Sequence, residues 1–267
     1  NLTLTDKPLS REMMPTNYLR AGLMRGLEQE AKLGVNPFKF GVVGSTDVHN
    51  SLTAIEEDNY YGKMPYQEPS PTRWEHVSKE GFGKTRYTWH YLAAGYAAVW
   101  ATANTREALW DAMQRKEVYA TTGPRIRVRL FGGWEFDAAD ARRRDLAAIG
   151  YAKGVPMGSD LETKKGKAPS FAVWAVKDPD DANLDRIQII KGWSNNGQTF
   201  ERIYDVAWSG DRKPDPKTGK VPAVGNTVDV VNVTYENSIG ATELKAVWTD
   251  PDFDPSLNAF YYARAIQ

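Results

Sequence analysis

Asp47, His49 and Asn50 directly follow an apolar run in the stretch KFGVVGSTDVHNS, residues 39–51. An Asp and a His two positions apart, just past a strand, can both reach one ion, because the strand fixes the backbone and the next turn brings both side chains inward. A carboxylate and an imidazole together suit Zn, Mn or Fe. The same residue types also occur as a turn cap and as an ordinary loop histidine, so the motif leaves both interpretations open.

The other two histidines lie in sequence contexts that do not suggest metal ligands. His76 lies in the polar segment RWEHVSKE, and His90 lies among aromatic residues in YTWHYLAAGY, a context typical of a core or lid position. The chain contains no H-x-H, no H-E-x-x-H, no glycine-rich phosphate loop and no G-x-S-x-G. Because a catalytic metal needs at least three protein ligands, we expect Asp47 and His49 alone to hold one ion at most.

A second group with chemical potential lies in EVYATTGPRI, residues 117–126. Thr121, Thr122 and Gly123 would end one strand, Pro124 would stiffen the turn, and Arg125 would start the next strand. Backbone N–H groups, two hydroxyls and a guanidinium can bind an anion, so Thr122 and Arg125 are candidate substrate-binding residues together with Asn50. A purely structural connector is the alternative.

A helix followed by a buried strand is expected to position the Asp-x-His pair. Apolar spacing predicts a helix over residues 16–33, with Thr16 or Asn17 as its cap and Gly34 as its stop. The apolar run 38–44 then has the length of a strand. A strand that is apolar on both faces is typical of a parallel sheet covered on both sides, which indicates an α/β fold here.

Residues 51–100 form a long excursion, and the proline-rich part KMPYQEPSPTRW is expected to be a loop. The next segment, NTREALWDAMQRKE, opens with Asn104 and Glu107 in the spacing of a helix capping box. We therefore predict a helix over residues 104–117.

After residue 116 the periodicity changes from helical spacing to strict alternation, starting with RIRVRLF. Further short strands separated by turn residues predict an antiparallel β-sandwich. The predicted domains are therefore an α/β part, residues 1–116, and a β-sandwich, residues 117–267. The further predicted strands are SFAVWAV, DRIQIIKGW, ERIYDVAW, TVDVVNVTY, ELKAVWT and AFYYARAI.

Composition excludes several classes of protein. The 34 basic and 34 acidic residues balance, so no global field attracts nucleic acid or an anionic membrane. The chain has no cysteine for disulfides or thiolate metal sites, and no apolar run is long enough for a membrane-spanning helix. Nine tryptophans suit sandwich cores and sugar-like or aromatic ligands, with core filling as the simpler interpretation.

Several blocks of this sequence resemble the DUF3604 family, which is similar to the PHP superfamily of metal-dependent phosphoesterases. The matching blocks extend from about residue 20 to the end of the sequence. They are EAKLGVNPFKFGVVGSTDVHNS, EEDNYYGK, AAVWATANTREALWDAMQRKEVYATTGPRIRVRLFGGWEF, GVPMGSDL, DANLDRIQIIKGW, YDVAWSG and ELKAVWTDPDFDPSLNAFYYAR.

The resemblance implies a distorted (β/α)7 barrel with its metal centre at the carboxyl ends of the strands. Asp47 and His49 match the last ligand motif, and the expected H-x-H near the start is missing. The chain is therefore expected to be the C-terminal portion of a longer protein, with the missing N-terminal segment as its partner. The implied site has a divalent metal (Zn, Mn or Fe) held by Asp47 and His49 as catalytic ligands, with Asn50 as their support. The Thr121–Arg125 turn and the 58–90 excursion would shape the pocket.

Three functions remain in competition. The first is a metal-dependent hydrolase of small-molecule phosphate esters. The second is a non-catalytic β-sandwich module for binding or structure, with a remnant of the metal site. The third is a sulfate-ester or amide hydrolase on the same scaffold, because the fold does not fix the substrate. The resemblance further implies an exported protein, periplasmic or secreted, and the balanced charge predicts no nucleic-acid partner.

Overall fold

The structure is a computed structural model that describes residues 10–13, 18–51, 63–64, 71–72, 75–81, 84–88, 95–164 and 166–267. The chain folds into two compact units, each made of several segments. The first contains Asn1–Ala21, Val42–Ala98 and Tyr119–Gly123, and the second contains Gly22–Gly41, Val99–Val118 and Pro124–Gln267. The predicted domain boundary between residues 116 and 117 stays a prediction.

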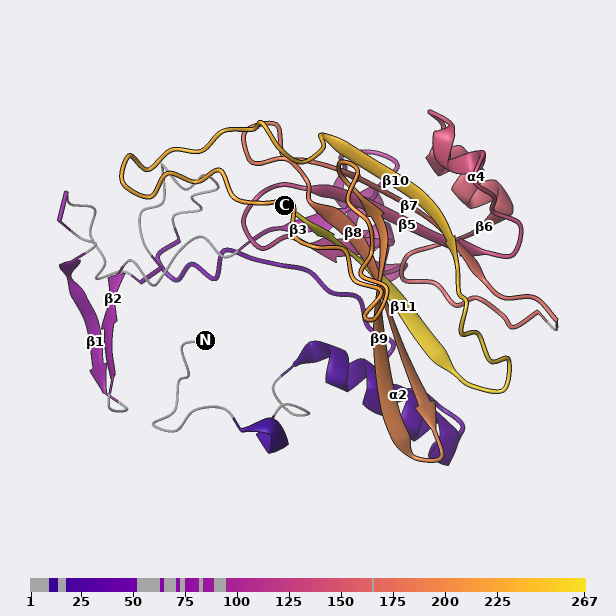
Figure 1. The fold of residues 1–267 in the computed structure, drawn as a ribbon. Coiled ribbons are helices and arrows are strands. Elements are labelled where there is room, and N and C mark those ends of the chain that lie inside the picture. Colours follow the sequence, from indigo (N-terminus) through magenta and orange to yellow (C-terminus); the bar gives the residue numbers. More distant parts are fainter. Residues whose placement is uncertain are drawn as a thin grey trace. The chain divides into compact units, whose positions relative to one another are not determined.

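Two antiparallel sheets dominate the second unit (Figure 1). One has the order β10 (Glu243–Thr249), β7 (Ser170–Val176), β5 (Arg127–Gly133), β6 (Gly154–Pro156). The other has the order β11 (Ala259–Ile266), β8 (Arg186–Asn195), β9 (Gln198–Trp208). The predicted antiparallel sheets are thereby confirmed, and the strands SFAVWAV, ELKAVWT and AFYYARAI coincide with β7, β10 and β11.

One hydrophobic core lies between these two sheets. Val173 of β7 and Ile187 and Ile189 of β8 are fully buried in it. The rings of Phe171 and Tyr261 meet there with their centroids 4.4 Å apart. Full burial of a side chain of this size stabilises the fold by about 1.5–3 kcal/mol, so the alternation of apolar residues along the strands drives the sandwich-like packing.

The predicted strand TVDVVNVTY, residues 227–235, is wrong. The structure forms only a single bridge between Asp229 and Thr234, and Val231 is 89% exposed. The carboxylate of Asp229 accepts the N–H groups of Val231 and Asn232, which closes a turn in the middle of the segment. Because the backbone folds back through the four turn residues 230–233, the valines have no sheet face to cover.

Helix α4 (Leu146–Lys153) is an element that the sequence did not predict. It covers the outer face of the four-stranded sheet, where Leu146 packs with Phe131, Phe136 and Ala172 in a second small core. The 3-10 helix η5 (Asp140–Arg142) lies just before it in the chain.

Helix α2 (Leu19–Leu33) confirms the predicted helix, and Gly34 follows it with a φ of 74°, as expected for a glycine stop. Its proposed cap residues, Thr16 and Asn17, lie outside the described residues. Helix α3 (Arg106–Gln114) is capped by Thr105, whose hydroxyl accepts the N–H of Ala108 at 3.3 Å. The predicted capping box from Asn104 to Glu107 is therefore wrong by one residue.

The predicted buried parallel strand at residues 38–44 does not form in the structure. Phe38, Phe40 and Val43 are all exposed. A buried parallel strand needs neighbours for its backbone N–H and C=O groups, and in the described part of the chain no strand pairs with this segment. The structure therefore gives no support to a (β/α)7 barrel.

Three shorter elements complete the described fold. Within the expected excursion, β1 (Val77–Gly81) pairs antiparallel with β2 (Lys84–Tyr87), so part of it is a hairpin and not a loop. β3 (Ala97–Val99) pairs with β4 (Val118–Ala120). The 3-10 turn η1 (Arg11–Met13) precedes α2. None of the helices in the described ranges is long and apolar enough to cross a membrane.

Candidate functional site

The structure brings the side chains of Asp47 and His49 together in the first unit. Oδ1 of Asp47 lies 3.9 Å from Nε2 of His49. The backbone sets this up, because Asp47 has a φ of 56°, a left-handed conformation that a non-glycine residue adopts at some energetic cost. The hydroxyl of Ser45 accepts the N–H of Asp47 at 3.3 Å, which stabilises the turn.

The imidazole of His49 is held in one tautomer by its own turn. Its Nδ1 lies 2.7 Å from the carbonyl oxygen of Asp47. A carbonyl oxygen can only accept, so Nδ1 carries the proton and Nε2 of the neutral ring has a lone pair. A ring N–H engaged by a carbonyl oxygen, with the second ring nitrogen left over, is the arrangement typical of histidines that ligate metals.

Lys63 supplies the positive charge next to this pair. Its ammonium contacts Oδ2 of Asp47, and its carbonyl oxygen accepts the N–H of His49 at 2.7 Å. The hydrogen bond from Lys63 lowers the pKa of Asp47 below its ordinary value. The carboxylate is therefore charged at neutral pH, as a metal ligand must be.

Asp47 and His49 form an open pair of potential metal ligands. The side chains of Asp47 and His49 are 55% and 51% exposed, so both remain accessible from solvent. Within the described ranges, the chain has no cluster of three or more residues of the types that bind metals. The donors present fit one divalent ion, which would take its remaining ligands from water, substrate or other residues.

The sequence offers Asn50 as a support for this pair and gives little prospect of a ligand role for the other two histidines. Asn50 lies in the same turn and is half-buried, and its supporting role stays a prediction. His76 lies 3.3 Å from the hydroxyl of Thr72 through its Nε2. His90 lies outside the described residues.

The turn at residues 121–125 is held by its neighbours on both sides. The hydroxyl of Thr121 accepts the N–H of Tyr96 at 3.1 Å, while Thr122 is exposed. The N–H of Arg125 donates to Oδ2 of Asp178 at 2.6 Å, and its guanidinium lies 3.5 Å from Asp180. These contacts make Arg125 an anchor for the 178–180 loop, and the anion-binding roles of Thr122 and Arg125 stay predictions.

Comparison with known proteins gives a family for the chain. The family model described as "Protein of unknown function (DUF3604)" matches residues 2–267. The chain belongs to the DUF3604 family. Searches of curated proteins and of solved structures found no match. The function of this DUF3604 protein must therefore be argued from its own side chains.

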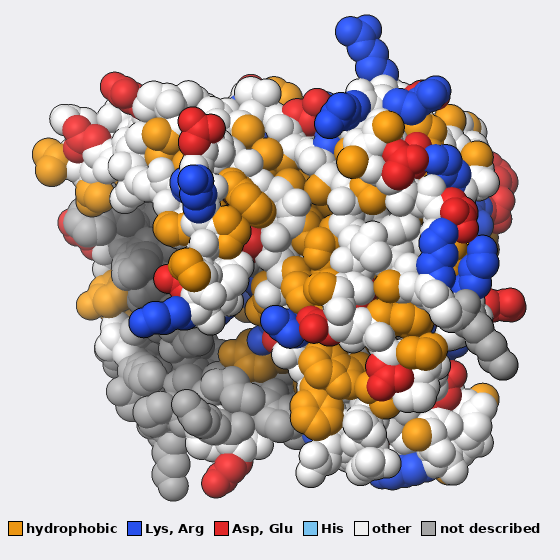
Figure 2. Space-filling model, turned by 45° about the vertical axis from the view of Figure 1, so that its right-hand side comes forward, with side chains coloured by type: hydrophobic (Ala, Val, Ile, Leu, Met, Phe, Trp, Pro, Cys, Tyr) orange, Lys and Arg blue, Asp and Glu red, His pale blue; other side chains and the backbone are white. Residues whose placement is uncertain are grey.

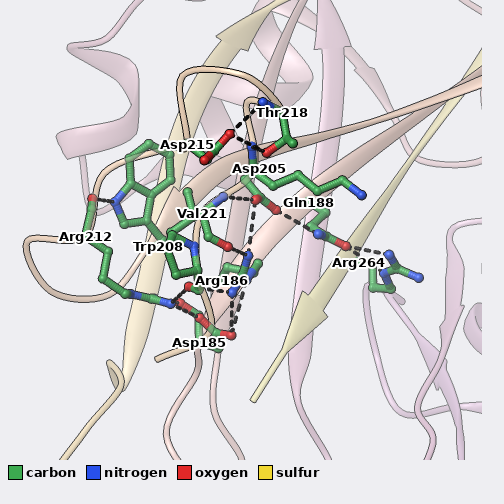
Figure 3. Close-up of polar contacts among 12 residues, drawn as sticks. Asp185, Arg186, Gln188, Asp205, Trp208, Arg212, Asp215, Thr218, Val221 and Arg264 are labelled. Carbon is green, nitrogen blue, oxygen red and sulfur yellow. Dashed lines mark hydrogen bonds and ion pairs between the residues drawn. The ribbon is translucent and has the colours of Figure 1, made fainter. Parts of the chain in front are cut away.

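An extensive polar network lies in the described part of the second unit of this DUF3604 chain, and the sequence did not predict it (Figure 3). Arg186 is buried and donates to Asp185 at 2.9 Å and to Asp205 at 3.1 Å. It also donates to the carbonyl oxygens of Val221 and Pro222. The alternating pattern of β8 places Arg186 on a strand but gives no hint of its burial.

Arg212 extends this network to the loop after β9. It donates to the carboxylate of Asp185 at 2.5 Å, to the carbonyl oxygen of Pro222 at 2.6 Å and to the hydroxyl of Ser209 at 3.0 Å. Arg186 and Arg212 donate to acceptors of the chain itself, and these hydrogen bonds hold residues 209–222 against the sheet that contains β8 and β9. We assign it a structural role.

Proposed function

We propose that Asp47 and His49 hold a divalent metal ion and that this DUF3604 protein takes part in metal-dependent ester hydrolysis. The observation that carries the proposal is the orientation of His49. Its Nδ1 proton is engaged by the Asp47 carbonyl at 2.7 Å, while its Nε2 lies 3.9 Å from the Asp47 carboxylate. Two potential metal ligands of different type therefore lie close together, which supports the proposal.

When bound, a divalent ion would supply Lewis acidity and lower the pKa of a coordinated water. The protein's own residues do the positioning. His49 offers its Nε2, because its Nδ1 is engaged by the turn, and Asp47 offers a charged oxygen. Lys63 provides a cation beside the same carboxylate, and its ammonium can donate a hydrogen bond to an anionic ester oxygen.

Phosphate esters are the first candidate substrates. The support is the resemblance of Asp47-x-His49 to the last ligand motif of PHP-like phosphoesterases, together with the nearby Lys63 ammonium, which favours an anionic substrate. A sulfate-ester or amide hydrolase would use the same ligands. A binding or structural module without turnover remains the alternative from a different class.

A substrate panel separates these functions. The protein, loaded with Zn²⁺ or Mn²⁺, is assayed with p-nitrophenyl phosphate, p-nitrophenyl sulfate and an amino-acid p-nitroanilide. We expect turnover of the phosphate ester, and its loss in Asp47→Asn and His49→Gln but not in the control His76→Gln. Turnover that stays within about tenfold of wild type in Asp47→Asn would contradict a ligand role. No turnover of any ester, with metal bound, would favour the binding module.

A further inference from the structure

Strands β8 and β9 form a long hairpin (Figure 1). Two aromatic side chains on this hairpin form a stacked pair. Trp193 and Phe200 are directly opposite in the register of these strands. Their ring centroids lie 5.5 Å apart at an interplanar angle of 17°, and Phe200 is 39% exposed. Because the two rings stack on each other and the Lys191 ammonium lies 5.4 Å over the Trp193 ring, the flat apolar face open to a ligand is the exposed part of Phe200.

Arg202 and Tyr204 lie on the same face of β9 as Phe200, because these residues are two positions apart along the strand. Their polar groups form a cluster beside the aromatic pair. Arg202 donates to Oδ2 of Asp252 at 2.7 Å, and the hydroxyl of Tyr204 donates to the same oxygen at 2.6 Å. The side chains of Arg202 and Asp252 are 58% and 44% exposed. The flat apolar face therefore has a charged hydrogen-bonding pair next to it along the strand.

A buried ion pair fixes the position of Asp252. Lys191 is buried and donates to Asp250 at 2.6 Å and to the carbonyl oxygen of Asp252 at 2.7 Å. Asp250 in turn accepts the N–H of Asp252 at 2.9 Å and the hydroxyl of Tyr261 at 2.6 Å. A buried ion pair contributes little net stability. The Lys191–Asp250 pair instead holds the backbone of Asp252 in one position.

The next residue in the chain adds a further aromatic ring. Phe253 directly follows Asp252 and packs edge-on against Trp134, with the ring centroids 6.1 Å apart. Asp252 therefore has an aromatic residue next to it in the sequence and accepts a hydrogen bond from a second one, Tyr204 of β9.

We propose that Trp193, Phe200, Arg202 and Asp252 form a binding site for a neutral carbohydrate. The apolar C–H face of a pyranose ring stacks on a flat aromatic surface, and its adjacent hydroxyls are both donors and acceptors. Arg202 can donate to one hydroxyl and Asp252 can accept from its neighbour. A few fixed polar groups beside an apolar surface are typical of small-molecule sites.

Charge balance favours a neutral sugar over an anionic one. The Arg202 guanidinium is neutralised by Asp252, and the Lys191 ammonium by Asp250. On the face shown in Figure 2, basic and acidic side chains are intermixed, with hydrophobic side chains between them and no broad area of one sign. An anionic ligand would have to displace Asp252 from Arg202, which the Tyr204 hydrogen bond and the fixed backbone oppose.

The test uses a panel of soluble oligosaccharides with the wild-type protein. Cellopentaose, maltopentaose and mannopentaose represent neutral sugars, and trigalacturonate represents anionic ones. Binding is followed by tryptophan fluorescence and calorimetry in the presence of EDTA, so that a failure of the metal-site proposal does not affect the result. We expect saturable binding of at least one neutral sugar and none of trigalacturonate.

Matched variants then locate the site. Phe200→Ala and Arg202→Met should each weaken binding by about tenfold, the effect of losing about 1.4 kcal/mol of contact. The control is Trp110→Ala on α3, which removes a side chain that is 61% exposed and should leave binding unchanged. Circular dichroism confirms that each variant is folded.

Three results would overturn the proposal. The first is the absence of saturable binding by any neutral sugar in the panel. The second is undiminished binding in folded Phe200→Ala, and the third is binding of trigalacturonate alone.

Discussion

Nε2 of His49 lies 3.9 Å from Oδ1 of Asp47, while the ammonium of Lys63 contacts the other oxygen of the same carboxylate. One carboxylate is thus shared between a fixed imidazole and a fixed cation. The left-handed backbone at Asp47 and the hydrogen bond from His49 Nδ1 to the Asp47 carbonyl create this geometry within three residues. The candidate metal pair therefore depends on a local turn.

Removal of the Lys63 ammonium should tighten metal binding. In Lys63→Met the cation that competes for Asp47 is lost, while the carbonyl that accepts the His49 N–H remains. An exposed ion pair contributes about 1 kcal/mol or less, so we expect Zn²⁺ affinity measured by calorimetry to rise by up to about fivefold. Lys164→Met, which removes an ammonium that pairs with Glu135, is the control. Weaker binding in Lys63→Met would mean that the ammonium positions the ligands.

Truncation of Arg186 should destabilise the second unit strongly. Arg186→Ala leaves the buried carboxylates of Asp185 and Asp205 without this cation, a change that typically costs about 3–5 kcal/mol. Urea unfolding measures the loss of free energy. Arg144→Ala, at an exposed position, is the control and should change it by less than about 0.5 kcal/mol. Similar values for both variants would show that the network in Figure 3 contributes little.

Asp178 should make folding stability depend on pH in the acid range. Burial alone would raise its pKa, but the N–H groups of Arg125 and Asp180 and the Arg125 charge outweigh burial, so the pKa lies below its ordinary value. The unfolded chain takes up this proton at higher pH than the folded chain. The ionised Asp178 carboxylate therefore contributes its full stabilisation above its pKa in the unfolded chain, about 3.9. This stabilisation is lost as the pH falls through the lower pKa of Asp178 in the folded chain.

Urea unfolding between pH 6 and pH 3 checks this prediction. Asp178→Asn should be less stable than wild type at pH 6 and should lose less stability on acidification. Asp211→Asn, at an exposed carboxyl group, is the control for the loss of one negative charge. An identical acid slope in wild type and Asp178→Asn would contradict the account.

The sheets could be predicted from the sequence because their strands alternate between a core face and a second face. SFAVWAV and AFYYARAI matched β7 and β11 for this reason. TVDVVNVTY is also rich in residues that favour strands. In the structure, however, the Asp229 side chain accepts backbone N–H groups and closes a turn inside the segment, and this local hydrogen bonding outweighs the strand propensity. The apolar run 38–44 failed for a different reason, since burial of a strand depends on neighbours that the local sequence does not specify.

The chemistry of the candidate site was predictable only in part. The types and spacing of Asp47 and His49 identified the pair, and the structure places their side chains together. Lys63 is 16 positions from Asp47 and was missed, because a lysine in a proline-rich excursion carries no recognisable signal. The support of Asp252 by Lys191 was missed too, since this contact across 61 positions joins β8 to the loop after β10 and depends on how the two sheets pack.

The central claim is that Asp47 and His49 share one metal ion, and a Zn²⁺ titration followed through the imidazole ¹⁵N resonances tests it most directly. We predict that Nε2 of His49 shifts on binding, that Nδ1 keeps its proton, and that no more than one equivalent binds tightly. Asp47→Asn should abolish the shift, and the resonances of His76 should not respond. A His49 shift that survives in Asp47→Asn, a response at His76 instead, or two tightly held equivalents would contradict the account.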